Sequence, residues 1–596
     1  MTISAGAKAF LSLGIVAAII ISGFYIVNAN RDGSEGERGL PNFSSEHQLQ
    51  YFLALHGGAR EGVLDYDQMI SQAEASGSTT YTKTNTQVAG VDEMDSIETD
   101  GIHIYIATRD RVNIVKAAPA DAMSNVGVIM VKDLIKTSAE SWYYVDGIFL
   151  TGDELVVMIS IYDYGKGEGV YSLYDYYYGY QARTVLCLLD VSDPSAPALV
   201  DAKGISGYLL SARLHDGVAY LITEQSIWDG HGTAMPVIWS GGSYSNEPVS
   251  SIRYDPNATD VRSYTNVLSF RLSDHEANVT SVLMGYGSVI YATGENIYVT
   301  STVWGTTGNW AFSDPTTTIY RLHLDGLIVT PNGIGQVPGS PLNQFSMDEH
   351  DGHLRIATNS GWQSGENMVF VMDGTMNVIG ELRGIAMNET IRAVRFMNDT
   401  LYLVTFFQTD PLFIIDLSDP THLIVLGELV MPGFSSYLQD LGNGLLIGVG
   451  WENGTLKLSL YDVSDPAEPK ILSNIITPAW AYSEAQYDHH AFMYDAATGT
   501  IGIPVWTYGQ NGQGGAFIYR LEDRSLTFKG MVQSDNSTSA RCLLIDDHLY
   551  TISSTTVSSW SSIDLGHIGS ITFREADEPV YFVCGEISTV LERGEA

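Results

Sequence analysis

Basic side chains are scarce in this 596-residue sequence. Lys and Arg together number 30, against 69 Asp and Glu, so the formal net charge is −39. A surface this acidic repels phosphate backbones, and we therefore expect no nucleic-acid partner. The charge is compatible with plain solubility, with a salty medium, or with a cationic or basic ligand.

Cysteine is also rare, with only Cys187, Cys542 and Cys584. Their spacing matches no zinc or redox motif, and three residues are too few for a disulfide scaffold. Cys187 lies in the apolar run "TVLCLLD", which is typical of a buried small hydrophobic residue. One disulfide between distant cysteines stays open.

The familiar catalytic and metal-binding motifs are missing. The sequence contains no G-x-S-x-G, no H-E-x-x-H, no EF-hand spacing and no cysteine in a nucleophile motif. The Gly-rich stretch 508–517 lacks the Lys-Ser/Thr pair of a phosphate loop and fits a hairpin instead. We predict no cofactor, and a divalent cation has no motif to support it. Catalytic carboxylate pairs stay open, because 69 acidic residues offer many.

The N-terminus contains one long uncharged apolar run, from Ala9 to Ala29, between Lys8 and Arg31. Its 21 residues are enough to cross a bilayer. A signal peptide usually has a shorter core and a small-x-small cleavage site, so an uncleaved anchor is favoured over a cleaved signal. Both interpretations place the rest of the chain outside the cytoplasm, either anchored to the cell membrane or secreted. The N-x-S/T triplets agree with this, and they begin at Asn42, Asn257, Asn278, Asn388, Asn398, Asn453 and Asn536.

The first ninety residues contain one short helix. Ser45 and Gln48 can form a capping box, and Leu49, Phe52 and Leu53 would share an apolar face. We therefore divide the chain into an anchor or signal (1–30), a linker with a short helix (31–89), a β-domain (90–576) and a C-terminal tail (577–596).

A short phrase recurs within the β-domain. "DVSDP" begins at Asp190 and again at Asp462, and "DLSDP" begins at Asp416. Asp and Ser bond nearby backbone N–H groups and Pro presets φ, so each copy predicts a turn between a third and a fourth strand. Residues 395–430 fit a four-stranded antiparallel meander around such a turn.

A second turn can be followed along the whole β-domain, between the first and second strands of each unit. We place it at 100–101, 152–153, 216–217, 294–295, 351–352, 398–399, 443–444, 498–499 and 546–547. Repeats of about 45–60 residues with four strands each predict an all-β fold, a β-propeller. We expect eight to nine blades, because one unit need not be a true blade.

A family resemblance supports this fold. "TNTQVAGVDEMDSIETDG" (84–101) resembles the T-N-x-Q-V-x-G-V-D-E-x-D signature of secreted archaeal and bacterial proteins with a C-terminal β-propeller distantly related to WD-40 repeats. The lead-in "FSSEHQLQYFL" and the stretch "YDHHAF" (487–492) look similar to that family too. The resemblance covers roughly 43–575 and implies an extracytoplasmic propeller, but no activity.

Three acidic or His-rich clusters deserve a structural and a functional interpretation. "YDHHAFMYD" contains Asp488, His489, His490 and Asp495. Adjacent residues of a strand point to opposite faces, so we expect structural histidines and no metal site. We interpret "MDEHDGHL" (347–354) as a solvated turn, and Asp92, Glu93 and Asp95 as structural residues rather than cation ligands.

The units differ most in the link between their second and third strands. This link is long at 161–182 and 224–265, in units two and three, and moderate in unit four (304–316) and unit eight. Its aromatic residues give a candidate binding surface: Tyr162, Tyr164, Tyr171, Tyr174, Tyr176, Tyr177, Tyr178, Tyr180, Trp228, Trp239, Tyr244, Trp304 and Trp310. These rings either contact a ligand or only pack the loops onto the propeller.

The sequence thus favours a membrane-anchored, non-enzymatic propeller that binds a cell-surface protein or glycan through these loops. The alternative is a hydrolase or lyase that acts on envelope polymers with carboxylates at the central channel. A structural envelope component is a third possibility.

Overall fold

A computed structural model describes most of residues 39–574. The ranges within it that are not described are 58–80, 83–84, 137–140, 165–179, 228–233, 259–260, 305, 308–310, 313, 362–364, 407–409, 478–479, 508–512 and 535–538. Contacts divide the chain into Met1–Gly39 and Leu40–Ala596. The second unit contains every element described below.

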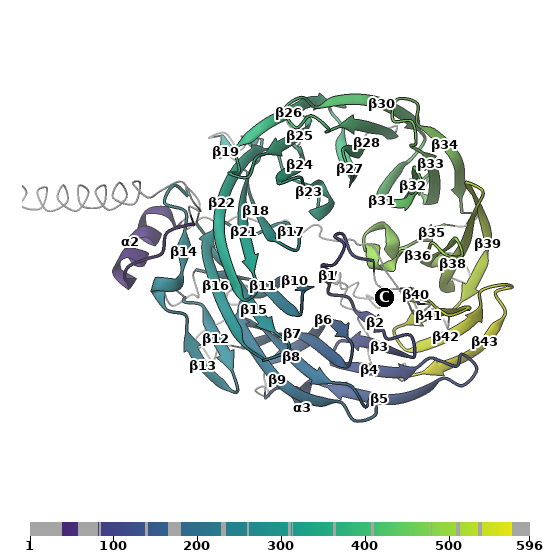
Figure 1. Cartoon of the computed structure of the whole chain (residues 1–596), viewed down its shortest axis with the longest axis horizontal. Coiled ribbons are helices and arrows are strands. Elements are labelled where there is room, and N and C mark those ends of the chain that lie inside the picture. Colours follow the sequence, from purple (N-terminus) through teal and green to yellow (C-terminus); the bar gives the residue numbers. More distant parts are fainter. Residues whose placement is uncertain are drawn as a thin grey trace, which may run out of the picture. The chain divides into compact units, whose positions relative to one another are not determined.

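The second unit is a ring of four-stranded antiparallel sheets (Figure 1). Blade one contains β2 (Ile97–Thr99), β3 (His103–Thr108), β4 (Arg111–Lys116) and β5 (Ser124–Met130). Blade two contains β6 (Trp142–Thr151), β7 (Glu154–Tyr164), β8 (Tyr180–Asp190) and β9 (Ala198–Ser206). Blade three contains β10 (Tyr208–His215), β11 (Val218–Ser226), β15 (Ser263–Arg271) and β16 (Ala277–Met284). Blade four contains β17 (Ile290–Ala292), β18 (Asn296–Val303), β21 (Thr316–Asp325) and β22 (Ile328–Pro338).

Five further blades complete the ring. Blade five contains β23 (Met347–His350), β24 (His353–Asn359), β25 (Asn367–Met372) and β26 (Val378–Ile385). Blade six contains β27 (Thr390–Met397), β28 (Thr400–Phe406), β29 (Asp410–Asp416) and β30 (Ile424–Met431). Blade seven contains β31 (Phe434–Gly442), β32 (Leu445–Glu452), β33 (Thr455–Asp462) and β34 (Lys470–Ile476). Blade eight contains β35 (Ala481–Tyr482), β36 (Met493–Asp495), β37 (Thr500–Thr507), β38 (Gln513–Glu522) and β39 (Ser525–Gln533). Blade nine contains β40 (Ser539–Ile545), β41 (His548–Ser553), β42 (Thr556–Ser561) and β43 (His567–Thr572).

The all-β propeller prediction is confirmed, and its count of eight to nine blades resolves to nine four-stranded blades. In blade eight the inner position is divided between β35 and β36, which both pair with β37. All nine predicted turns join the first and second strands of a blade. Asp351 and Gly352 show why these dipeptides recur: both have positive φ, as a type I′ hairpin turn requires.

The recurring D-x-S-D-P phrase forms the predicted turn between third and fourth strands in blades two, six and seven. Asp462, for example, accepts a hydrogen bond from the backbone N–H of Ser464 at 3.1 Å. The turn also contacts the preceding blade. A Cβ added to Gly427 of β30 would lie 2.3 Å from the carbonyl oxygen of Pro466. Gly127 and Gly380 face Pro194 and Pro420 in the same way, so the phrase contributes to contact between neighbouring blades.

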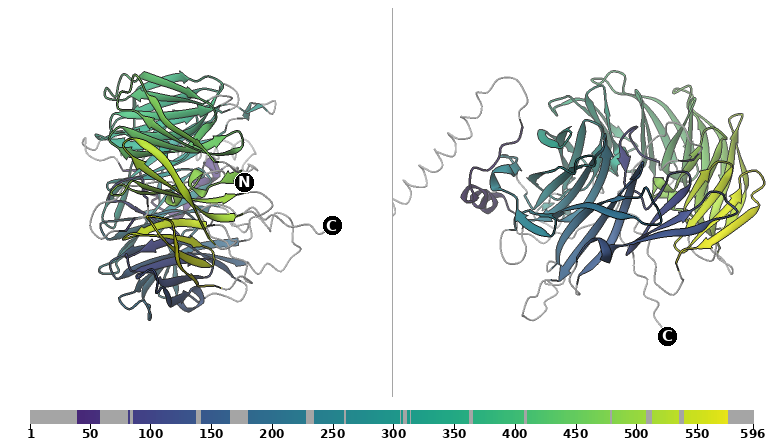
Figure 2. Two further views of the ribbon diagram at one scale, coloured as in Figure 1. Left: turned by 90° about the vertical axis from the view of Figure 1, so that its right-hand side faces the viewer. Right: turned by 60° about the horizontal axis from the view of Figure 1, so that its bottom comes forward.

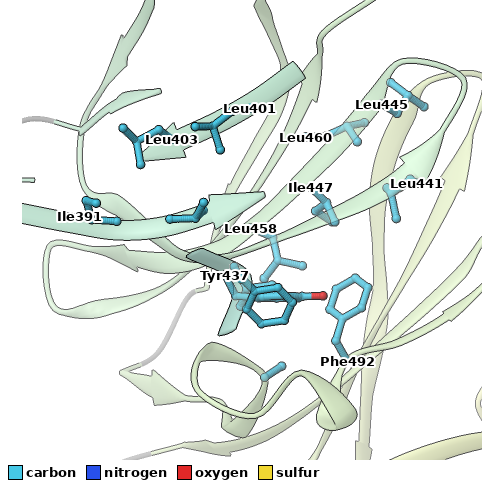
Figure 3. Close-up of a cluster of buried hydrophobic side chains, with 14 of the residues drawn as sticks. Ile391, Leu401, Leu403, Tyr437, Leu441, Leu445, Ile447, Leu458, Leu460 and Phe492 are labelled. Carbon is cyan, nitrogen blue, oxygen red and sulfur yellow. The ribbon is translucent and has the colours of Figure 1, made fainter. Parts of the chain in front are cut away.

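The core lies between the blades, because the middle strands are buried on both faces. Every described residue of β25 is buried, whereas the outer strand β34 is mostly exposed. Figure 3 shows the cluster that extends over blades five to eight, where Tyr437 and Phe492 meet with ring centroids 5.8 Å apart. Each sheet therefore depends on its neighbours for burial, as the ring architecture requires.

The predicted short helix is confirmed as α2 (Glu46–His56). Ser45 caps it by accepting from Gln48 N–H, and the expected face of Leu49, Phe52 and Leu53 is buried. The Gln48 side chain accepts from the backbone N–H of Ser44 rather than of Ser45, so the reciprocal half of the predicted box is displaced by one residue.

The long link of blade three is itself folded. It contains β12 (Val237–Ser240), β13 (Ser243–Asn246), the 3₁₀ turn η1 (Val249–Ser251) and β14 (Arg253–Tyr254). β12 extends blade two by pairing with β9, and β14 pairs in parallel with β16 (Figure 1). Tyr254 stacks on Phe43 at 4.0 Å, beside α2. Other short elements are α3 (Val131–Leu134), the β19–β20 pair (Thr306–Thr307, Ala311–Phe312) and η2 (Gln344–Ser346).

Blade nine packs on blade one to close the ring. Tyr550 donates a hydrogen bond to the carbonyl of Ala117, and the two blades share one apolar cluster. Tyr81 and Thr82 add to the inner edge of blade nine by pairing with Ile545 and Leu544. Closure thus uses segments from both ends of the described chain.

In the described part of the chain, no helix has the length and hydropathy needed to cross a membrane. The predicted anchor at residues 9–29 lies outside that part and stays a prediction. Cys187 is buried and free, as its apolar run predicts. Cys542 is buried and free too, and Cys584 lies outside the described residues.

Candidate functional site

The second strand of each blade, after which the aromatic links begin, ends at one face of the ring. We call this the insert face. The antiparallel order of each blade places the start of the first strand there too. Figure 2 shows the ring from the side, with strands running between its two faces. Blades two, three and four are consecutive in the ring, so the strand ends that begin and end their links lie on adjacent blades at this face.

Only part of the predicted aromatic surface lies among the described side chains. Tyr162, Trp239, Tyr244 and Trp304 are described. The backbones of Tyr164 and Tyr180 pair across β7 and β8. The other predicted aromatic residues lie outside the described residues: Tyr171, Tyr174, Tyr176, Tyr177, Tyr178, Trp228 and Trp310.

Some of the described rings pack a link onto the propeller, and others are exposed and free to contact a ligand. Trp239 packs against the apolar cluster shared by blades one and two, so it holds its link onto the propeller. Trp304 and Tyr244 are 47% and 58% exposed, respectively, and remain available for contact.

Three tyrosines form a row across blades two and three at the insert face. The rings of Tyr144 and Tyr162 stack at 5.6 Å with their hydroxyls 2.7 Å apart, and Tyr208 follows at 5.8 Å from Tyr162. Tyr208 is 40% exposed, and Trp142, at the start of β6, is 61% exposed. Tyr144, Tyr208 and Trp142 lie outside the long links that we predicted as the surface, because they stand at or near the starts of first strands. The rule that first strands start at the insert face would have found them.

A second candidate site lies inside the ring, where residues 85–95 run past the inner strands. We call these residues the axial segment; its strand β1 (Asp92–Glu93) pairs with β10 (Figure 1). Asn85 donates to the carbonyl of His489 in blade eight, and Gln87 donates to those of Gln344 and Met347 beside blade five. The resemblance motif thus corresponds to a segment that contacts blades on several sides of the ring.

The axial segment ends in a buried ion network. Arg541 of β40 contacts Asp95 at 2.5 Å and Asp488 at 2.5 Å, and all three side chains are less than a tenth exposed. Burial opposes ionisation of Asp488, but Arg541 and His490 outweigh it, and the pKa of Asp488 lies below its usual range. This network joins the axial segment to blades eight and nine.

The two histidines do not lie on a strand, contrary to our prediction. His489–Ala491 form the 3₁₀ turn η4, capped by Asp488, after the similar turn η3 (Glu484–Gln486). In this turn both rings come together, with centroids 3.9 Å apart. Asp495, which we grouped with them, instead caps the turn before β37.

Glu93 faces both imidazoles. Its Oε2 lies 3.8 Å from Nε2 of His489 and 3.9 Å from Nε2 of His490. Burial, together with the charges of His490 and Arg541, lowers the pKa of His489 far below its usual range, so this ring is neutral. Burial also raises the pKa of Glu93, although Arg213 and His490 oppose the shift. The ligand atoms of Glu93, His489 and His490 lie within 4.8 Å of one another, which is close enough to hold a metal ion.

The "MDEHDGHL" stretch forms the predicted turn between β23 and β24. It lines a cleft of about 440 Å³ together with the axial segment and the blade-four turn. Asp348 is paired with Arg355, and Glu349 accepts from Asn296 and Thr293. These two carboxylates thus already have protein partners.

The predicted glycosylation sites are accessible where they are described. Asn42, Asn257, Asn278, Asn388, Asn398 and Asn453 are all exposed, and Asn536 lies outside the described residues. Attachment of a glycan at these positions stays a prediction.

The fold and its inner segment define a nine-bladed propeller, and the comparisons identify its family. Residues 81–565 match the family described as Beta propeller domain, and the chain belongs to that family. An uncharacterized protein of Archaeoglobus fulgidus is 26% identical, over 95% of this chain and 100% of its own length. An uncharacterized protein of Methanocaldococcus jannaschii is also 26% identical, over 79% of this chain and 80% of its own.

Two solved structures show only distant likeness. A periplasmic gluconolactonase of Pseudomonas aeruginosa has a TM-score of 0.33 and 10% identity, covering 52% of this chain and 91% of its own. A putative 6-phosphogluconolactonase of Bacteroides fragilis has a TM-score of 0.32 and 12% identity, covering 53% of this chain and 92% of its own.

Proposed function

We propose that this protein is an extracytoplasmic, membrane-anchored binding module that recognises a cell-surface protein or glycan at the insert face of blades two to four. The main support is the row formed by Tyr144 and Tyr162 of blade two and Tyr208 of blade three. The exposed Trp142 also belongs to blade two. Tyr and Trp rings offer large contact areas at low entropic cost, and their flat faces stack on sugars. The residues Trp304 and Tyr244 extend the exposed aromatic area from the neighbouring links.

The hydrolase or lyase alternative has less support. Three carboxylates inside the ring, Glu93, Asp95 and Asp488, are only 3%, 5% and 6% exposed. Asp348 and Glu349, which line the cleft, are partly exposed but already paired with Arg355, Thr293 and Asn296. An enzyme acting on polymers needs its acid and base within reach of the substrate. We therefore rank binding first, and expect purified protein to release no soluble fragments from isolated envelopes.

Site-specific photo-cross-linking on intact cells tests the proposal. A photoreactive residue replaces Trp142 or Tyr208 in the full chain, and cross-linked products are identified by mass spectrometry. Trp480 is the matched control. It is 69% exposed and directly precedes a first strand, but that strand belongs to blade eight and not to blades two to four. We expect one recurrent partner from positions 142 and 208 and none from 480. The same products from all three positions, or none from 142 and 208, would contradict the proposal.

Two further arms define the partner and the location. Periodate oxidation of the cells removes cross-linking if the partner is a glycan, and protease treatment of isolated partner material removes it if the partner is a protein. Protease added to intact cells should also degrade the propeller if residues 9–29 anchor it outside the cytoplasm. Protection of the propeller in intact cells, with degradation only after lysis, would contradict the proposed location.

A further inference from the structure

His489 has an unusual environment for a buried polar side chain. It is 1% exposed, and neither ring nitrogen makes a hydrogen bond within the described part of the chain. Its ring lies edge-on to Phe345, with centroids 5.7 Å apart. Buried polar atoms nearly always have a hydrogen-bond partner, and an unsatisfied one costs about 1–3 kcal/mol. The two free nitrogen positions therefore need an explanation.

The neighbours of His489 are potential metal ligands. Nε2 of His490 is buried and also lacks a hydrogen bond in the described structure, and both Nε2 atoms lie 3.8–3.9 Å from Oε2 of Glu93. Ligand atoms of all three residues lie within 4.8 Å of one another. Two ligands at about 2.0–2.1 Å from one tetrahedral ion are about 3.3 Å apart. The carboxylate oxygen would have to approach each imidazole nitrogen by about half an ångström to reach this spacing.

A second layer of contacts holds these ligands in place. Nδ1 of His490 lies 3.0 Å from Asp488, which is in turn paired with Arg541. A carboxylate that orients the far nitrogen of an imidazole is the usual support of a metal-bound histidine. Oε1 of Glu93 accepts from the backbone N–H of Gln87 at 3.0 Å. Oε2 faces the histidines, and the side-chain amide of Gln344 lies 3.5 Å from both carboxylate oxygens, at the long limit of a hydrogen bond.

We propose that Glu93, His489 and His490 bind one first-row divalent cation of the zinc class, and that this ion ties the axial segment to blade eight. Two imidazoles and one carboxylate are a donor set preferred by such ions. Asp95 and Asp488 form an overlapping group with His490, but Arg541 already pairs with both carboxylates. The site is independent of the aromatic surface, so its failure would leave the proposed function untouched.

The competing description contains no metal. In it, a proton on His490 links the carboxylates of Glu93 and Asp488, and His489 is simply buried. The two descriptions differ in what His489→Leu does. Without a metal, replacing an unpaired buried imidazole by an apolar side chain is neutral or stabilising. With a metal, it removes a ligand.

The experiment uses the full chain, purified, stripped with a chelator and titrated with Co²⁺ and then Zn²⁺. We expect one equivalent of Co²⁺ to give the visible absorption of imidazole-bound cobalt, and Zn²⁺ to displace it. His489→Leu should lose this signal, while the control His422→Leu, which removes an exposed histidine of a D-x-S-D-P turn, should keep it. Chelator should lower the unfolding temperature of the wild type and of His422→Leu, but not that of His489→Leu.

Three outcomes overturn the proposal. The first is a wild-type chain that binds no stoichiometric Co²⁺ or Zn²⁺, which does not depend on any variant folding. The second is a His489→Leu chain that retains the cobalt signal. The third is a wild-type unfolding temperature that chelator leaves unchanged, because an ion that binds only the folded state must stabilise it.

Discussion

Arg541 and Asp95 are 446 residues apart in the chain, yet they form a two-pronged buried ion pair. Nε of Arg541 donates to one carboxylate oxygen at 3.2 Å and Nη2 donates to the other at 2.5 Å. Both side chains are 3% exposed. The pair joins the axial segment to the last blade, and so links the beginning of the propeller to its end.

Arg541→Met is expected to destabilise the fold strongly. It would leave Asp95 and Asp488 buried without their cation, and removing one partner of a buried pair costs about 3–5 kcal/mol. Denaturant unfolding followed by tryptophan fluorescence measures the loss. Arg271→Met, which breaks the exposed contact with Asp274, is the control and should leave the unfolding midpoint unchanged. Equal midpoints for the two variants would show that the buried pair contributes no special stability.

Gly427→Ala tests the contact between blades six and seven. The new methyl group would lie 2.3 Å from the carbonyl oxygen of Pro466, and we expect a loss of about 1–3 kcal/mol from overpacking. Gly374→Ala is the matched control, because its nearest neighbour would be 4.0 Å away. The control should be neutral or slightly stabilising, since alanine restricts the unfolded chain. Differential scanning calorimetry compares the two variants. An unchanged unfolding temperature for Gly427→Ala would refute the contact between the D-x-S-D-P turn of blade seven and the outer strand of blade six.

Tyr550→Phe tests ring closure. The hydroxyl of Tyr550 donates to the carbonyl of Ala117 at 3.0 Å across the junction of blades nine and one. Its removal should cost about 1–3 kcal/mol, because a buried acceptor loses its partner. Tyr519→Phe should be neutral or stabilising, because the buried Tyr519 hydroxyl makes no hydrogen bond in the described structure. Urea midpoints of both variants check this, and the reverse order would contradict the closure model.

Glu224 is expected to make stability depend on pH. Burial raises its pKa from 4.5 to about 7, against the opposing hydrogen bonds from Gly287 N–H and Ser263. A carboxyl group with a raised folded-state pKa stabilises the fold fully below about pH 4.5, and this contribution is lost as pH rises through 7. The difference in unfolding free energy between wild type and Glu224→Gln should therefore shift by about 3 kcal/mol from pH 4 to pH 8. Urea unfolding at several pH values measures it, and parallel pH profiles would contradict the assignment.

Much of the fold could be predicted from local patterns. Dipeptides such as Asp351-Gly352 predict tight hairpins because their backbone angles suit them, and nine of them fix the order of strands. The helix at α2 was predictable for the same reason, since Ser45 and the apolar face are neighbours in sequence. The inner position of blade eight was less regular, because the 3₁₀ turns η3 and η4 separate β35 from β36.

The candidate sites were only partly predictable. The long links directed our prediction to blades two to four, but Trp142 and Tyr208 stand at the starts of first strands and lie outside these links. Glu93 and the His489–His490 pair were each interpreted as structural, because each was considered alone. The pair was also assumed to lie on a strand, whereas the capping contact of Asp488 holds it in a turn.

The sequence by itself determined the blades, because strand alternation and turn chemistry act between residues that are close in the chain. It also determined which links are long and aromatic. Only the tertiary structure decided that Glu93 faces His489 and that Asp95 faces Arg541. Those contacts span some 400 residues and form only when the ring closes around the axial segment, so no local pattern records them.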